Sequence, residues 1–164
     1  MLVAKESNLI AIKLDDGENL LSGLEQAFNQ NMIKSAVIVG GIGMVTGFKL
    51  GYYTGTEYVS REFNEPHELV SLQGNVSQVD GGKLMLHLHA SVSAKDNTMF
   101  GGHLLAATVK NMAEIFAFRL VDIELRRRKN EKSGLNELEF HKVSETKLSH
   151  GTKHRSGSME LDLD

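Results

Sequence analysis

Short apolar segments, many rich in valine, isoleucine and aromatic residues, recur along most of this 164-residue chain. Glycine, asparagine and aspartate separate them, for example at residues 15–17, 80–82 and 95–97. Strand-forming segments that alternate with turn residues predict a mostly antiparallel β-sheet. We expect strands at residues 9–14, 35–39, 44–53, 57–63, 68–72, 74–79, 83–93, 99–109, 113–124 and 135–143.

One segment, residues 18–31, has the periodicity of a helix. Its apolar side chains recur at intervals of three and four residues. They are Leu20, Leu21, Leu24, Ala27 and Phe28. We expect Asp15 or Asp16 to cap the helix, and Glu18 to lie in its first turn, where the helix dipole favours negative charge.

These patterns predict a single α+β domain, with a mostly antiparallel sheet packed against a main N-terminal helix. The length suits one domain, and the chain contains no cysteine, which excludes disulfides and thiolate metal sites. We assign the domain to residues 1–143. Residues 144–164 are mostly polar, and we expect a flexible C-terminal tail there.

Charge and hydropathy limit the classes of partner. The chain has 18 basic and 21 acidic residues, a formal net charge of -3. Affinity for double-helical DNA comes largely from Lys and Arg neutralising phosphates, so this balance disfavours direct DNA binding. Residues 1–14 do not resemble a signal peptide, and no apolar run approaches the roughly 20 residues of a membrane span. We expect a cytoplasmic protein without a membrane partner.

Three histidines are candidates for a metal site. His87 and His89 are two residues apart on a predicted strand, so their side chains project from the same face. If Ala94 pairs with Thr98 across the turn at residues 95–97, His103 lies directly opposite His89. Directly opposed residues of an antiparallel pair share a face, so all three imidazoles are expected to gather there. A register shift of one residue would send His103 to the other face.

Three imidazoles can hold a divalent cation and leave a fourth tetrahedral position for water or a ligand. Zinc is the first choice, and nickel, copper and iron also accept histidine. The alternative is that these are surface histidines without a metal. We expect surface positions for the remaining histidines, His67, His141, His150 and His154.

Other motifs carry weaker signals. Glu65 and Glu68 are candidate catalytic carboxylates, although nothing in their spacing places them near the histidines. The glycines at 40, 41 and 43 lack the spacing of a phosphate-binding loop and are better explained as turn residues between strands. The basic run at residues 126–129 is typical of either a nucleic-acid contact or a solvated strand end, and we favour the strand end.

Several segments together resemble the plants-and-prokaryotes-conserved (PPC) domain over about residues 9–140. They are GGIGMVTGFKLGYY, HELVSLQGNVS, LMLHLHASVSAKDNTMFGGHLL, FRLVDIELRRR and SGLNELEF. The H-L-H segment followed by G-G-H-L is the most specific. The resemblance implies a compact α+β unit that assembles as a homotrimer. It also implies that His87, His89 and His103 are the family's three histidines, which are associated with zinc in prokaryotic members.

Members of this family often carry a DNA-binding label. That label comes largely from plant members with a separate AT-hook, whose Arg-Gly-Arg core is absent from this sequence. Three hypotheses therefore remain. The protein is a DNA-associated or transcription-regulatory oligomer, a zinc-dependent hydrolase or lyase, or a module whose metal anchors a small anionic ligand. We favour metal-dependent handling of a small molecule.

Overall fold

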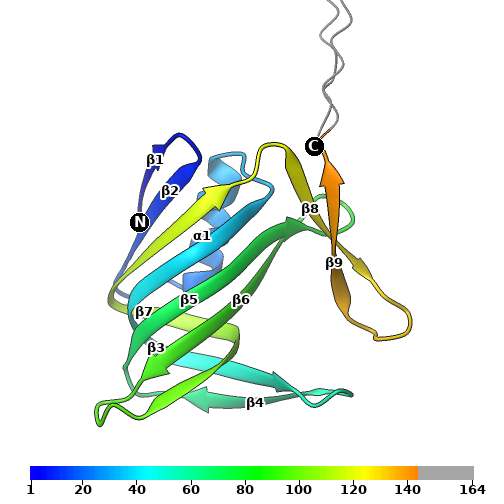
Figure 1. Cartoon of the computed structure of the whole chain (residues 1–164). Coiled ribbons are helices and arrows are strands. Elements are labelled where there is room, and N and C mark those ends of the chain that lie inside the picture. Colours follow the sequence, from blue (N-terminus) through cyan, green and yellow to red (C-terminus); the bar gives the residue numbers. More distant parts are fainter. Residues whose placement is uncertain (144–164) are drawn as a thin grey trace, which may run out of the picture.

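The computed structural model describes residues 1–143, and the expected tail at residues 144–164 lies outside the described residues. One sheet dominates the structure (Figure 1). Its strands are β1 (Leu2–Glu6), β2 (Leu9–Asp15), β3 (Ala36–Tyr53), β4 (Tyr58–Phe63), β5 (His67–Gln78), β6 (Leu84–Ser93), β7 (Met99–Arg119), β8 (Ile123–Lys129) and β9 (Asn136–Lys142). The single helix described is α1 (Leu20–Gln30).

The strand pairings form a closed circuit at the centre of the molecule. The order along the sheet is β1-β2-β7-β3-β5-β8-β9, and β6 pairs with both β5 and β7. Strands β7, β3, β5 and β6 therefore close on one another, which leaves few unpaired edges. All the pairings are antiparallel except a short parallel contact between β5 and β8. The prediction of a mostly antiparallel sheet is confirmed.

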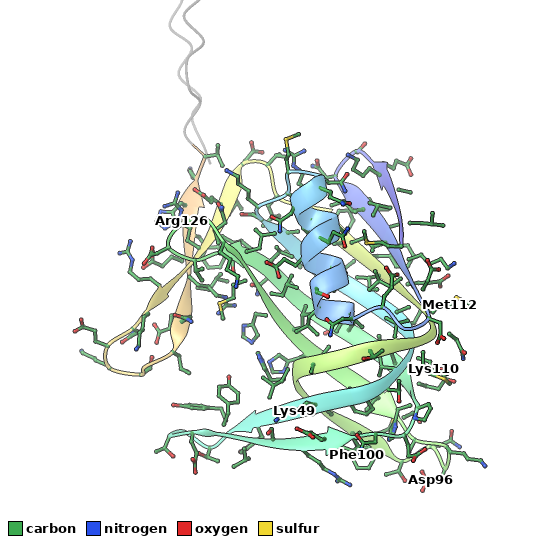
Figure 2. All side chains as sticks on the ribbon, turned by 180° about the vertical axis from the view of Figure 1, so that it is seen from behind. Lys49, Asp96, Phe100, Lys110, Met112 and Arg126 are labelled. Atoms are coloured by element: carbon green, nitrogen blue, oxygen red, sulfur yellow. The ribbon has the colours of Figure 1, made fainter. Side chains whose placement is uncertain are left out.

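The helix is smaller than the prediction of a main packing element implied. It has 11 residues and lies against one side of the sheet, in front of it in Figure 2. Its buried residues, including Leu24 and Phe28, pack into the core. The fold is therefore mostly β-sheet, and α+β describes it only loosely. The cap is also corrected, because Asn19 accepts the hydrogen bond from the Ser22 backbone N–H at 3.0 Å.

Several expected strand boundaries were wrong. The expected strands at 35–39 and 44–53 are one strand, β3, and its glycines lie inside that strand, at or beside shifts of register. Likewise, β5 joins 68–72 with 74–79, and β7 joins 99–109 with most of 113–124. Strand β1 was missed, and the basic run at 126–129 belongs to a strand, β8, that was also missed.

Alternation along the closed strands separates a core face from an outer face. Leu88, Ala90 and Val92 of β6 are buried in the core, whereas His87 and His89 point to the opposite side of the strand. The β3–β4 and β8–β9 hairpins extend beyond the main sheet on the same side of the molecule (Figure 1). No helix in residues 1–143 is long and apolar enough to cross a membrane.

Candidate metal centre

The hairpin of β6 and β7 brings the three predicted histidines together. The Ala94 backbone N–H donates to Thr98 O at 2.9 Å, which fixes the turn at residues 95–97. With that register His89 lies directly opposite His103, and the prediction of this pairing is confirmed. His87 is two residues before His89 on the same face. One ring nitrogen from each of the three side chains lies within 4.8 Å of the others.

The spacing of the ring nitrogens suits a shared metal ion. Nε2 of His87 is 3.3 Å from Nε2 of His89. Two nitrogens bound tetrahedrally at about 2.0–2.1 Å from one ion are about 3.3–3.4 Å apart, so this pair already spans one edge of such a site. The His103 ring is 5.0 Å from the His87 ring and 5.3 Å from the His89 ring, measured between centroids.

The environment of the rings also fits a metal. Burial lowers the pKa of His87 to about 4, and the nearby charge of Arg127 adds to this effect. Burial also lowers the pKa of His103, with a further contribution from His89. Both rings are therefore neutral near pH 7, as a metal ligand must be. Nδ1 of His103 is buried without a hydrogen-bond partner, so a ring nitrogen of this cluster has an unused lone pair or N–H.

Arg127 is a member of the site that the sequence did not indicate. It belongs to β8, and its Nη2 lies 2.6 Å from Nδ1 of His87 and 3.2 Å from Oδ1 of Asn75. Its Nη1 donates to the carbonyl oxygen of Asn136 at 2.8 Å. A guanidinium has no acceptor atom, so Nδ1 of His87 accepts in this contact and a neutral ring carries its proton on Nε2.

Each of the two projecting hairpins contributes one side chain that lies beside a histidine of the cluster. Arg127 comes from the β8–β9 hairpin, and Tyr58 comes from the β3–β4 hairpin. The Tyr58 ring lies 5.5 Å from the His103 ring, measured between centroids. A phenol and a guanidinium from outside the β6–β7 hairpin therefore lie beside the imidazoles, and Asn75 of β5 lies opposite His87.

The structure places the candidate carboxylates elsewhere. Glu65 and Glu68 line a groove of about 940 Å³ together with Asp96, and neither belongs to the group of potential metal ligands around the three histidines. Figure 2 shows Asp96 at the opposite end of the molecule from Arg126, the neighbour of Arg127 on β8. If either glutamate is catalytic, it acts in that groove and not at the three histidines.

Two other predictions need correction. His67 was expected at the surface, but it is only 7% exposed, and its Nδ1 lies 2.9 Å from the carbonyl oxygen of Glu65. The basic run is more than a solvated strand end. Arg126 and Arg128 are exposed and paired with Glu124 and Glu139, whereas the arginine between them points inward because side chains alternate along β8.

Together, the closed antiparallel sheet and the three-histidine cluster define a small β-sheet protein with a candidate metal centre on its outer face. The chain belongs to the Plants and Prokaryotes Conserved (PCC) domain family, whose model matches residues 1–121. This confirms the family that the sequence motifs indicated. No similar protein was found among curated sequences.

Solved structures support the same family. A PPC protein from Pyrococcus horikoshii is 32% identical, with a TM-score of 0.74, over 87% of this chain and 96% of that one. A metal-containing protein from Archaeoglobus fulgidus is 35% identical, with a TM-score of 0.72, over 83% of this chain and 94% of that one. A protein from Bacteroides thetaiotaomicron, named as a candidate DNA-binding protein, is 26% identical, with a TM-score of 0.77, over 85% of this chain and 96% of that one.

Proposed function

We propose that the domain binds one divalent metal ion through His87, His89 and His103 and uses it to handle a small molecule. The observation that carries the proposal is the 3.3 Å separation of two Nε2 atoms, with a third imidazole in reach. Zinc is the first choice, because it accepts three imidazoles in tetrahedral geometry. The similar protein from Archaeoglobus fulgidus contains a metal, which supports the proposal.

The position of the cluster favours a working site over a purely structural one. His89 is exposed and the other two histidines are half-buried, so a fourth ligand can approach from outside the sheet. When bound, the metal would supply a Lewis acid and a coordination position for that ligand. Arg127 and Tyr58 are placed to orient what binds there. No acidic group of residues 1–143 joins the three histidines as a potential metal ligand.

We further propose that the domain assembles as a homotrimer. One face of the sheet exposes apolar side chains from three adjacent strands. They are Val37, Val39 and Ile42 of β3, Val70 of β5, and Phe116 and Phe118 of β7. The pairing of Val37 with Phe118 makes part of this patch continuous across two strands. Exposed apolar patches of this kind typically mark protein interfaces.

A DNA-associated role is the second candidate, because similar solved proteins carry DNA-binding names. The basic run on β8 gives it limited support. Arg126 and Arg128 are paired with carboxylates, and Arg127 is buried, so these three residues do not offer three free charges to phosphates. Salt-dependent retention of a DNA duplex by the protein would favour this role. Absence of retention at low salt would remove it.

Chelator competition tests the metal proposal. We expect the parent to remove zinc from a chromophoric chelator with one ion bound per chain, and the His87→Ala and His103→Ala variants to lose most of this affinity. His141→Ala is the matched control, because His141 is exposed on β9 and outside the cluster. Equal zinc affinity in all four proteins would overturn the assignment.

A further inference from the structure

Arg127 is a buried charge without an opposite charge beside it. It is 8% exposed, and it is the only buried lysine or arginine of residues 1–143. Its neighbours in sequence, Arg126 and Arg128, each face a glutamate. None of the ion pairs within the described residues includes Arg127. Buried charges in proteins are normally paired or bound to metals, so this guanidinium lacks a partner.

The hydrogen bonds of Arg127 leave Nε of the guanidinium without a partner. Nη1 is used by the carbonyl oxygen of Asn136, whereas Nε is buried without any partner. Nη2 contacts two neutral acceptors, Oδ1 of Asn75 and Nδ1 of His87. Nε and Nη2 form one edge of the guanidinium, and the N–H bonds of such an edge match the two oxygens of a carboxylate or phosphate.

Metal ligation by His87 would free this edge further. If His87 ligates through Nε2, its ring proton lies on Nδ1, which can then no longer accept from Arg127. Nη2 would lose that acceptor and need another. Imidazole binds a metal in its neutral form, so three such ligands would leave the full charge of a divalent cation uncompensated. Within residues 1–143, no carboxylate joins the three histidines as a potential ligand that could supply the missing negative charge.

We propose that Arg127 is the anion-binding residue of this site, and that the small molecule handled there carries a carboxylate or phosphate group. This inference deepens the proposed function and rests on it for the position of the ligand beside the metal. The oxyanion supplies the negative charge that both the guanidinium and the metal lack. Asn136 accepts from Nη1 and Asn75 accepts from Nη2, so the guanidinium is oriented before the ligand arrives.

Isothermal titration calorimetry of the full chain, loaded with one zinc per chain, tests the inference. Inorganic phosphate and acetate are the probes, and uncharged acetamide is the control ligand. We expect the parent to bind at least one of the two anions and to show no measurable binding of acetamide. The anion that binds more tightly identifies the oxyanion class. In Arg127→Met the dissociation constant should rise by about ten- to a hundredfold, as expected for lost charge-assisted hydrogen bonds.

Arg126→Met is the matched control, because it removes the same charge from the neighbouring residue, which is exposed. Its dissociation constant for the anion should remain that of the parent. Arg127→Lys keeps the charge but loses the two-point geometry, so it should recover part of the affinity. If Arg127→Met does not fold, two comparisons of dissociation constants test the inference instead. They are the anion affinity of Arg127→Lys against that of the parent, and the affinity of the parent for acetate against that for acetamide.

The outcomes separate this inference from the metal proposal. Zinc binding in the parent with no anion binding, or with anion affinity unchanged in both Arg127 variants, overturns the inference and leaves the metal proposal standing. The loading step is itself a zinc titration, and the anion titrations are repeated on metal-free protein. Anion binding that depends on Arg127 in a parent that holds no zinc supports the inference and removes the metal proposal.

Discussion

Gly74 is the residue through which the sheet most directly controls the histidine cluster. It lies on β5 opposite β6, and a Cβ atom added there would be 1.9 Å from the carbonyl oxygen of His87 and 3.0 Å from Cα of Leu88. Real Cβ atoms essentially never approach closer than 3.0 Å, and the atoms in the way are backbone. In Gly74→Ala the two strands must therefore separate by about 1 Å, or twist by an equivalent amount.

We expect this separation to reduce the free energy of unfolding by about 2 kcal/mol or more, the upper part of the range for overpacked cores. The φ of +156° at Gly74 adds to the cost for any other residue. Because the displaced atom belongs to the backbone of His87, zinc affinity should fall as well. Urea unfolding at a fixed chain concentration, followed by circular dichroism, measures the first effect, and chelator competition measures the second.

Gly40→Ala is the control for this prediction. Gly40 is also a strand glycine, on β3, but a Cβ added there has no heavy atom within 4 Å. Its free energy of unfolding should stay within about 0.5 kcal/mol of the parent. If Gly74→Ala is as stable as Gly40→Ala and binds zinc as tightly, then the close approach of β5 to His87 is not a feature of the folded protein.

Three further predictions concern the helix, acid stability and assembly. Asn19→Ala removes the helix cap and should cost about 1 kcal/mol in urea unfolding, whereas Asn29→Ala, on the exposed helix surface, should not. The backbone N–H of Asn111 lowers the pKa of Asp16 below its usual 3.8. The ionised carboxylate therefore stabilises the fold above pH 3.8, and this contribution is lost as the pH falls through the lowered pKa. Asp16→Asn should lose less stability on acidification than the parent does. Phe118→Asp should dissociate the proposed trimer in analytical ultracentrifugation, whereas Met32→Asp, exposed outside the apolar face, should leave it assembled; a trimer in both variants would argue against that face.

The histidine pairing could be predicted from the sequence because its causes are local. Strict alternation along β6 places His87 and His89 on one face, and a short turn of Lys95, Asp96 and Asn97 fixes the register to β7. Asn97 has a φ of +65°, a conformation that asparagine adopts more readily than most residues. The identity of the outer face and the position of His103 followed directly from this hairpin.

The lengths of the strands could not be predicted, because turn residues also occur at bulges. Gly43 has a φ of +143° inside β3, and Asn111 has a φ of +63° inside β7. In both places the chain kinks and continues in the sheet, whereas the composition indicated a break. Only the pairing with neighbouring strands distinguishes the two outcomes, and that information is not local.

Arg127 could not be found from the sequence either. It is 40 residues from His87 and 52 from Asn75, and nothing in the run of arginines distinguishes it from its neighbours. Its inward direction depends on the register of β8 against β9, where Arg127 pairs with Leu138. A weak signal was available, since alternation along a strand turns one of three consecutive arginines away from the other two.

Metal content per chain, measured by plasma mass spectrometry on untagged protein, tests the central claim most directly. The parent and the His87→Ala and His103→Ala variants are measured side by side, with circular dichroism to show that each is folded. The account predicts close to one zinc, or another divalent metal that binds imidazole, per parent chain and almost none in either variant. A folded parent that holds no metal after reconstitution, or variants that retain it, would contradict the account.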